Sequence, residues 1–499
     1  MCGILLVQSR TDIPLEKHLA ATELLSSRGP DFTRYQYRNG IFLAQTVLHI
    51  TGTTEFYNQT RSDFLAYNGE IYNYRWFGKY SNDIELAYQS ARDMPLKFRH
   101  LEGPWAWAYT DFVNIRYATD PQGEKCLYHY RDDDILIVCS EIAPILEYQK
   151  FNLVSKPHSE KHWPVRRTTP WQGIERCRPG LMYTNSTETV KIDSIFDWRK
   201  KYYYTNKQEA YQEFKNIFER VMQLMTPTQP VGITVSGGLD SACILKYLPE
   251  AQHFYTVNTQ GKDVVSPQAS ALLTTDQQQR NTVLTVDPQT WANDYKQATE
   301  YSKMPMQSWS FVGQWHIAKH CKEKILFTGV GADELFGGYT VYKNLWYFHD
   351  FSNSPYSRFD PADRDAVQDW KQCLEFYEDR GGPATFLMDY LTMVSAVDLR
   401  GVDTMTQAHG VEPRSPFVHP DIIKFAINLP WEYKIGKPFI HQLFLETWAP
   451  ELIHPKQGFA GHCNDSYPWL GIDIDRVPDR EQDWKNINQA AFQQIVDPR

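Results

Sequence analysis

One stretch of the sequence constrains the fold more than any other: VGITVSGGLDSACILKYL, residues 231–248. An apolar strand over 231–235 runs into the glycine-rich turn SGGLDS and then into a helix from Ser241. Glycines let the backbone approach a ligand closely, and the free amides at the start of a helix point toward an anion. The pattern predicts a phosphate-binding loop, although a plain glycine turn between a strand and a helix would leave the same signature.

The residues that follow alternate between strand and helix patterns as far as residue 328, which predicts βαβ units and a parallel sheet. In open α/β sheets, ligands bind at the carboxyl ends of the strands. The segment ILFTGVGADELFGGY, residues 325–339, delivers Asp333 and Glu334 to such an end. Mg²⁺ prefers oxygen donors, so these acids are candidate metal ligands, although a solvated acidic helix start would look alike. After Gly338 the chain is mainly helical in pattern.

The first 194 residues have a different pattern, in which short apolar strands such as GILLV and DILIVCS are separated by turn residues. After Asn206 the apolar residues recur at helical spacing, which predicts a helix. Asn206 is its expected N-cap, and Glu209 follows three residues later as in a capping box. This change predicts one domain over 1–195, a second over 205–470 and a C-terminal extension over 471–499. The apolar positions of the expected helix are Tyr211, Phe214, Phe218, Val221 and Met225.

Composition narrows the class of protein. A net charge of -9 over 499 residues disfavours a nucleic-acid partner, because that affinity comes largely from Lys and Arg on phosphates. No run of about 20 apolar residues predicts a membrane span, and the first residues do not have the pattern of a signal peptide. The eight cysteines show no C-x-x-C spacing, so we expect neither a zinc site nor a disulfide framework. A chain without disulfides suits a reducing compartment, so we expect a cytoplasmic location.

The SGGLDS turn resembles the pyrophosphate loop of ATP pyrophosphatases. Together with GVGADELFGG, it resembles the synthetase domain of glutamine-dependent asparagine synthetases. Further matching segments lie in both halves of the chain: Cys2-Gly3-Ile4, RGPD (28–31), YNGEIYN (67–73), the ND-I-E pattern around Asp83, EGPWAWAY (102–109), SEI (140–142), GVEPRSPF (410–417) and HPKQGF (454–459).

The resemblance implies an α/β multidomain fold: an N-terminal αββα Ntn-hydrolase-type sandwich, then a doubly wound α/β ATP-pyrophosphatase domain with a helical C-terminal part. It also implies a reaction at each of two sites. Glutamine is hydrolysed to ammonia at the first; at the second, aspartate is activated by ATP and Mg²⁺ as β-aspartyl-AMP, and ammonia displaces AMP. The implied partners are the small molecules glutamine, aspartate and ATP, with no nucleic acid and no membrane, and a homodimer is one arrangement the resemblance allows.

The resemblance also assigns roles to residues. Cys2 would be the nucleophile, with an oxyanion hole from Asn68 and the Gly69 amide, while Glu70 and Asp83 would hold the ammonium of glutamine. From the residues alone, Cys2 could equally start a buried strand and Asn68-Gly69 could be a hairpin turn. The implied ATP-binding residues are Val235, Ser236, Gly237, Gly238, Asp240, Ser241, Gly331 and Lys456; the metal ligands are Asp240 and Asp333; Glu334 and Arg414 are substrate-binding or structural candidates.

Three positions depart from the family's pattern. Val47 stands where an arginine clamps the carboxylate of glutamine, a role for which Arg28 is the candidate substitute. Val330 replaces a glutamate near the reacting carboxylate. Ile440 replaces a lysine, unless Lys437 serves from a shifted register. These departures leave open another carboxylic acid as acceptor, including the ring closure of the related β-lactam synthetases, or a non-catalytic member that acts by binding.

Overall fold

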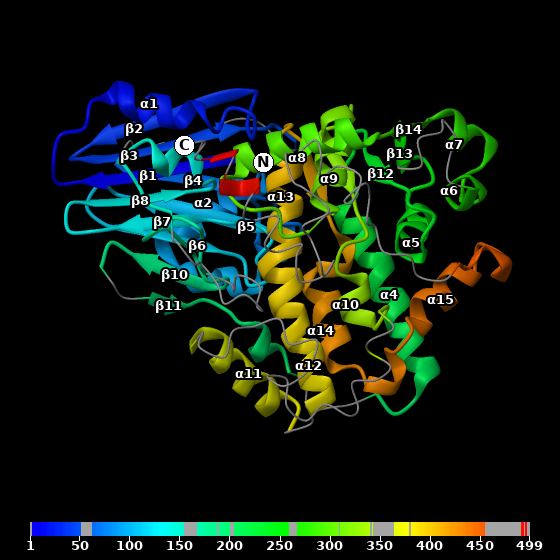
Figure 1. The fold of residues 1–499 in the computed structure, drawn as a ribbon. Coiled ribbons are helices and arrows are strands. Elements are labelled where there is room, and N and C mark those ends of the chain that lie inside the picture. The colour runs from blue at the N-terminus through cyan, green and yellow to red at the C-terminus, as the bar shows by residue number, and fades with distance from the viewer. Residues whose placement is uncertain are drawn as a thin grey trace.

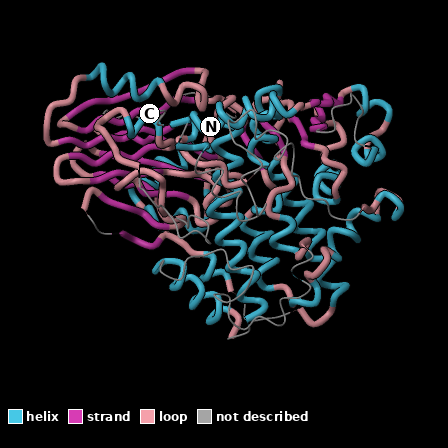
Figure 2. The backbone as a smooth tube through the Cα atoms, in the orientation of Figure 1, coloured by secondary structure: helices cyan, strands magenta, loops and turns pink. Residues whose placement is uncertain are grey.

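A computed structural model describes residues 2–50, 62–153, 167–186, 189–199, 204–258, 267–308, 310–339, 342, 364–378, 381–454, 491–493 and 495–496. Within this part of the chain, strands gather in the N-terminal half and helices in the C-terminal half (Figures 1 and 2). The fold is therefore mixed α/β in two parts, with a largely helical second part, as the sequence predicts.

The N-terminal half is a sandwich of two antiparallel sheets with helices outside. The sheets have the orders β2-β3-β1-β8-β7-β9 and β11-β10-β6-β5-β4. The elements are β1 (Cys2–Ser9), α1 (Leu15–Glu23), β2 (Phe32–Arg38), β3 (Ile41–Val47), β4 (Phe64–Gly69), α2 (Asp83–Asp93), β5 (Trp105–Thr110), β6 (Ile115–Thr119), β7 (Tyr128–Arg131), β8 (Ile135–Cys139), α3 (Ala143–Leu146), β9 (Glu175–Arg176), β10 (Leu181–Thr184) and β11 (Thr189–Lys191).

The first strand, β1, is buried on both faces, which explains its unbroken apolar run. Side chains alternate across a strand. Ile4 and Leu6 accordingly enter the core between the two sheets, while Leu5 and Val7 pack on the outer side with residues of α1 and α3. This central position fixes Cys2 at the start of a rigid strand.

The C-terminal half contains a parallel sheet of order β14-β13-β12-β15-β16 with helices around it (Figure 1). Its elements are α4 (Lys207–Met225), β12 (Gly232–Thr234), α5 (Leu239–Tyr247), β13 (His253–Asn258), α6 (Pro267–Leu272), α7 (Thr275–Gln279), β14 (Asn281–Thr285), α8 (Pro288–Ser302), α9 (Ser310–His320), β15 (Ile325–Phe327), α10 (Ala332–Phe336), α11 (Arg364–Phe376), α12 (Gly381–Asp389), a π-helical segment (Tyr390–Asp398), α13 (Leu399–Gln407), β16 (Glu412–Arg414), α14 (Pro420–Asn428) and α15 (Pro438–Leu445).

The order of this sheet determines where a ligand can bind. The chain leaves β12 toward β13 and β14 on one side, and returns to β12 on the other side with β15. Ligands of doubly wound folds bind at the carboxyl ends of the strands where the order reverses in this way. The loops after β12 and β15, which carry SGGLDS and GVGADE, meet at that point.

Helix α4 begins as the sequence predicts. The side chain of Asn206 accepts hydrogen bonds from the backbone amides of Gln208 and Glu209, and so satisfies two free donors of the first turn. All five apolar positions expected on its inner face are buried: Tyr211, Phe214, Phe218, Val221 and Met225.

Buried charges join the two halves. Asp403 of α13 accepts from Arg28 Nη2 at 2.7 Å and from Lys125 Nζ at 2.6 Å. Burial opposes ionisation of Asp403, but the two cations hold its pKa below the ordinary value. Near the C-terminus, Phe492 packs in the core of the N-terminal half (C in Figure 1).

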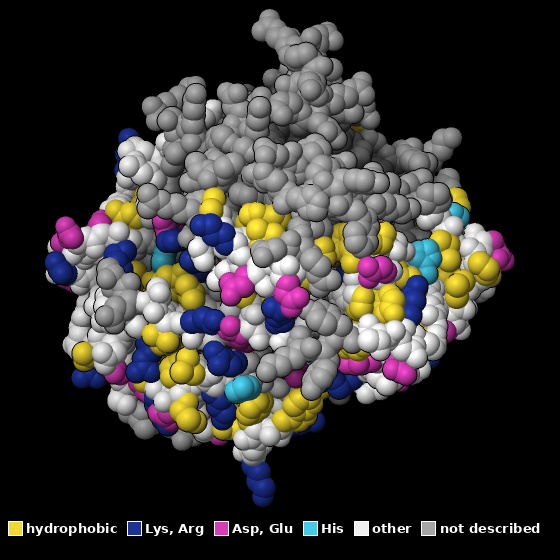
Figure 3. Space-filling view, turned by 90° about the horizontal axis from the view of Figure 1, so that it is seen from below, with side chains coloured by type: hydrophobic (Ala, Val, Ile, Leu, Met, Phe, Trp, Pro, Cys, Tyr) yellow, Lys and Arg dark blue, Asp and Glu magenta, His cyan; other side chains and the backbone are white. Residues whose placement is uncertain are grey.

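The described surface has a mixed character. Lys and Arg are interspersed with acidic and hydrophobic side chains on the face in Figure 3. Within the described residues, no helix has the length and apolarity needed to cross a bilayer.

Candidate functional sites

The first candidate site forms where β1 faces β4. The backbone nitrogen of Cys2 donates to Asn68 Oδ1 at 3.0 Å, and both side chains are buried. The other end of the amide, Asn68 Nδ2, is buried and has no hydrogen-bond partner among the described residues. A buried donor of this kind is costly unless something else accepts from it, so Asn68 Nδ2 is available to a bound oxygen atom beside Cys2.

Two neighbours fix the position of Asn68. Gly69 has a φ of +151°, and a Cβ there would lie 2.3 Å from the carbonyl oxygen of Pro104, so the close approach of β4 to this loop requires glycine. On the other side, Gln45 Nε2 donates to the carbonyl of Tyr67 at 2.7 Å, across the space between the two sheets. No local sequence pattern marks Gln45, because its contact joins residues far apart in the chain.

Acidic side chains surround the same space. Burial, and then the charge of Glu70, raise the pKa of Asp83 to about 7, although its carboxylate accepts from the backbone amide of Ile71 at 3.1 Å. Burial and the charges of Asp83 and Glu70 also raise the pKa of Tyr67 well above its ordinary value. The structure therefore brings Glu70 and Asp83 together near Cys2, in a setting that favours a positively charged ligand group.

Arg414 forms an ion pair at the first site, which is the structural one of its two candidate roles. Its Nη2 donates to Glu70 Oε1 at 2.6 Å, both side chains are buried, and its guanidinium also contacts the carbonyl of Met225. The second oxygen of Glu70, Oε2, is buried without a hydrogen-bond partner among the described residues. Arg414 is thus an ion-pair partner between the two halves.

Arg28, the candidate substitute for the arginine missing at position 47, is bound by other groups. Val47 pairs with Cys2 in the antiparallel ladder of β1 and β3, so an apolar side chain stands beside the nucleophile position. Arg28 is fully buried and its guanidinium is bound by Glu141 and Asp403, which leaves it unsuited to clamp a substrate carboxylate. Arg28 is therefore not placed to take the role of the arginine missing at position 47.

The second candidate site lies at the switch point of the parallel sheet. In the first loop, Ser241 Oγ lies 3.3 Å from Ser236 Oγ and donates to the carbonyl of Gly238 at 3.0 Å. Gly237 has a φ of +82°, and a Cβ there would lie 2.7 Å from the side chain of Gln268. These contacts fix the loop at the start of α5, where the free amides of a helix start can bind an anion.

The two loops converge through their carboxylates. Asp240, in the first turn of α5, lies with its two oxygens 2.6 and 2.7 Å from Lys437 Nζ, and Asp333 Oδ1, in the first turn of α10, lies 2.7 Å from the same atom. Gly329 permits this approach, since a Cβ there would lie 2.9 Å from that of Asp240. Oxygen donors from two loops that converge on one point suit a hard divalent cation such as Mg²⁺.

The lysine that contacts the two acids of the second site is Lys437. Ile440 is fully buried in the hydrophobic core, whereas Lys437 N-caps α15 and reaches both carboxylates. The position of Lys437 beside both acids is what the shifted register would require of the family's lysine. Burial opposes the charged ammonium, but Asp240 and Asp333 together raise the pKa of Lys437 above its ordinary value.

The remaining predicted residues lie around this point. Glu334 accepts from the hydroxyl of Tyr339 at 2.6 Å, and burial and then the charge of Asp333 raise its pKa to about 7. Gly331 has a φ of +90° and packs against Val418, and Val330 is half-buried against the core. Val235 is buried at the end of β12. Lys456 lies outside the described residues.

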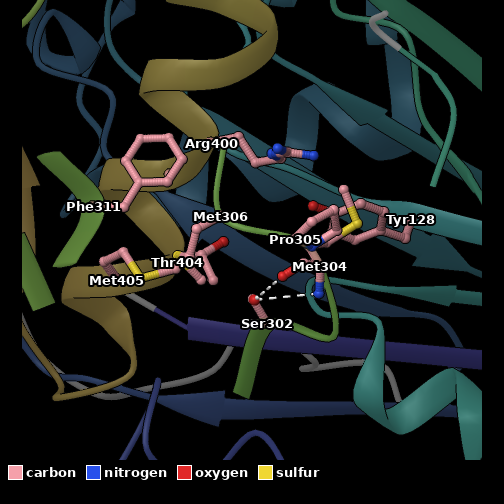
Figure 4. A pocket seen from close by; sticks show the side chains of 10 residues that line it. Tyr128, Ser302, Met304, Pro305, Met306, Phe311, Arg400, Thr404 and Met405 are labelled. Carbon is pink, nitrogen blue, oxygen red and sulfur yellow. Dashed lines mark hydrogen bonds between the residues drawn. The ribbon is translucent and has the colours of Figure 1, made fainter. Parts of the chain in front are cut away.

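Two other features lie away from the predicted residues. Figure 4 shows a pocket between the halves, lined largely by apolar groups such as Tyr128, Met304 and Phe311, with Arg400 at one side. Among the described residues, one group of three side chains has metal-ligand spacing: Glu102, His419 and Asp421. Arg220 forms ion pairs with both of these acids and Lys424 lies 3.8 Å from Asp421, so the two carboxylates already have two cations beside them.

Comparison with known protein families agrees with this two-part arrangement. Residues 1–203 match the model of the glutamine amidotransferase domain, and residues 215–462 match the model of asparagine synthase.

Individual relatives are distant in sequence. The chain is 25% identical to an asparagine synthetase [glutamine-hydrolyzing] of Cricetulus griseus over 517 positions, which cover 92% of this chain and 82% of that one. It is 23% identical to the asparagine synthetase [glutamine-hydrolyzing] 1 of Bacillus subtilis (71% and 61% covered), and 22% identical to the amidase chry2 of Gibberella zeae (66% and 56%). A solved glutamine phosphoribosylpyrophosphate amidotransferase of B. subtilis covers 47% of this chain and 60% of its own, at 14% identity and a TM-score of 0.29.

Proposed function

Because this chain belongs to the glutamine-hydrolysing asparagine synthetase family, we propose that it is an ATP-dependent asparagine synthetase that takes its nitrogen from glutamine. The observation that carries the proposal is the convergence of Asp240 and Asp333 at the switch point of the parallel sheet. It is supported by the second arrangement in the same chain, in which Cys2 is buried against Asn68 with an open amide donor beside it.

At the first site, removal of Met1 would leave an α-amine and a thiol on Cys2. The sulfur attacks the side-chain amide carbon of glutamine, and the α-amine takes the thiol proton and passes it to the departing ammonia. Asn68 Nδ2 and the Gly69 amide donate to the oxyanion that forms, and each such donor is worth about 3 kcal/mol. Water then releases glutamate from the thioester, while Asp83 and the free oxygen of Glu70 hold the ammonium of the substrate.

At the second site, the amides and serines of residues 236–241 bind the phosphates of ATP. The β-carboxylate of aspartate attacks the α-phosphorus, which forms β-aspartyl-AMP and releases pyrophosphate. Ammonia then attacks the acyl carbon, and AMP leaves. Asp240 and Asp333 would hold Mg²⁺, which when bound neutralises charge on the pyrophosphate.

A second candidate acceptor is a carboxylic acid other than aspartate. The observation that favours it is Val330, a half-buried apolar side chain where asparagine synthetases have a glutamate near the reacting carboxylate. One relative, at 22% identity, is named an amidase and not an asparagine synthetase. An apolar side chain there would suit an acceptor with an apolar group at that position.

The experiment that decides between these acceptors is pyrophosphate release from purified protein with ATP, Mg²⁺ and glutamine. Aspartate should trigger release of pyrophosphate together with asparagine, glutamate and AMP. If pyrophosphate release depends on a different acid, that acid and not aspartate is the acceptor. Absence of both glutamate release and pyrophosphate release, with a wide panel of acids, would support a non-catalytic binding protein.

A further inference from the structure

Lys437 occupies the point where the proposed metal ligands meet. Its ammonium lies 2.6 to 2.7 Å from three carboxylate oxygens, two of Asp240 and one of Asp333. Nothing in the reaction proposed above requires a lysine between the two acids. The contact is nevertheless well shielded, since the Lys437 side chain is only 6% exposed and those of Asp240 and Asp333 are 17% and 11% exposed.

The backbone holds Lys437 in this place. Its amide donates to the carbonyls of Phe336 and Lys434, and the amide of Gly436 donates to the carbonyl of Gly337 at 2.9 Å. Lys437 also has a φ of +58°, a left-handed conformation that a non-glycine residue adopts at a cost of about 1 kcal/mol or more. The segment before α15 is therefore fastened directly to the end of α10, the helix that carries Asp333.

Glycine makes room for the side chain. A Cβ at Gly338 would lie 1.9 Å from Asp333 Oδ1 and 2.2 Å from Lys437 Cε. The LFGG segment thus permits a packing in which the lysine passes directly over the backbone to reach the acids.

Size and charge make Lys437 and a divalent cation mutually exclusive between these oxygens. Mg²⁺ binds carboxylate oxygens at about 2.1 Å, so the acids must close around the metal by about half an ångström each. An ammonium among the same oxygens would be a like charge in direct contact with the metal. The metal can enter only when the ammonium leaves.

We propose that Lys437 is an internal counter-ion that holds Asp240 and Asp333 in the metal-free protein and is exchanged for the divalent cation. This inference rests on the proposed metal-dependent nucleotide site. Its consequence is that free Mg²⁺ competes poorly with the tethered lysine, so the metal enters as its complex with a nucleoside triphosphate. The displaced ammonium is then free to pair with the phosphates that arrive with the metal.

Binding of Mn²⁺ tests the exchange without any assay of activity. In wild-type protein without nucleotide, electron paramagnetic resonance should show little bound Mn²⁺ below about 1 mM, and clear binding once a non-hydrolysable ATP analogue is added. Tight binding of free Mn²⁺ to the Asp240 and Asp333 site of the wild type would overturn the proposal.

Lys437→Met and Lys437→Gln sharpen the test. Each should bind free Mn²⁺ at least about tenfold more tightly than the wild type, because a buried cation is removed from the site. Each should also unfold at a lower temperature without metal and regain stability with Mg²⁺. Lys437→Arg keeps the charge and should behave as the wild type.

Lys434→Met is the matched control, since Lys434 is a buried lysine of the same segment that lies over the rings of Tyr377 and Phe386 instead of a carboxylate. It should leave Mn²⁺ affinity unchanged. Equal Mn²⁺ affinity in wild type, Lys437→Met and Lys437→Gln would refute the exchange while leaving the proposed synthesis intact. If Lys437→Met and Lys437→Gln bind free Mn²⁺ more tightly but the wild-type protein forms no acyl-adenylate, the proposed synthesis is refuted and the exchange is supported.

Discussion

The two candidate sites are built in different ways. The site around Cys2 is formed by residues at the ends of strands in facing sheets, β1 and β4, which are buried on all sides. The site around Asp240 is formed by loops that the parallel sheet brings together, and its acids keep some exposure to solvent. Sheet geometry thus fixes the first site, whereas the second depends on glycine-rich turns that precede α5 and α10.

The two sites share one feature, a cation supplied from far along the chain. Glu70 is held by Arg414, which crosses from the other half of the molecule. Asp240 and Asp333 are held by Lys437 from within the same half. The first contact therefore also joins the two halves, and the second belongs to the nucleotide site alone.

The largest expected effect is that of Cys2→Ala on the first site. Removal of the nucleophile should lower glutamate release from glutamine by about 10⁴-fold or more. Pyrophosphate release with ammonia as the nitrogen source should stay within about twofold of wild type, since the second site is unchanged.

Cys177→Ala, at a buried cysteine of the same half, is the control and should keep both activities. Equal loss of both activities in Cys2→Ala would contradict the separation of the two sites.

Arg414→Met tests the contact between the halves. It leaves Glu70 buried without its cation, which should lower the free energy of unfolding by about 3 to 5 kcal/mol in urea titrations. The double variant with Glu70→Gln should recover much of this loss, because no buried charge is left unpaired. Lys324→Met removes the exposed ion pair with Asp31 across the same interface and should cost less than about 1 kcal/mol. Similar losses in both single variants would argue against a special role for Arg414.

Asp333→Asn tests the second site. With one proposed metal ligand neutralised, pyrophosphate release should fall by about 10²-fold, or about 2.7 kcal/mol of activation free energy, while glutamate release is retained. Glu334→Gln should have a smaller effect on pyrophosphate release, because Glu334 binds the hydroxyl of Tyr339 and is not one of the two proposed metal ligands. If Glu334→Gln lowers pyrophosphate release more than Asp333→Asn does, Glu334 and not Asp333 is the metal ligand.

The smallest effect concerns the pH dependence of glutamine binding. Asp83 has a pKa near 7 in the folded protein, so it is protonated below that pH and loses its attraction for the ammonium of glutamine. KM for glutamine should therefore rise by up to about tenfold for each unit of pH below 7. Asp83→Asn should abolish this dependence between pH 5.5 and 7, and an unchanged profile in that variant would assign the titration to another group.

The sequence by itself determined the class of each half and the main polar residues. Three patterns depend on local chemistry, which neighbouring residues specify. They are the SGGLDS turn after the strand at 231–235, the two acids after the strand at 325–328, and the helical spacing of apolar residues after Asn206. A local signal of this kind marked Asp333, whereas Cys2 and Asn68 were marked only by the family resemblance, and the structure brings Cys2 and Asn68 together.

Tertiary structure alone decided which charges meet. Arg414 could bind substrate or serve a structural role as far as the sequence shows, and it pairs with Glu70 because the direction of its side chain follows from the packing of the two halves. Arg28 has charged partners more than a hundred residues away, and Gln45 reaches a carbonyl in the facing sheet. Lys437 approaches the acids only because Gly338 leaves space and α15 begins beside α10. Contacts of this kind depend on distances between segments that are remote in sequence, which local residue patterns do not encode.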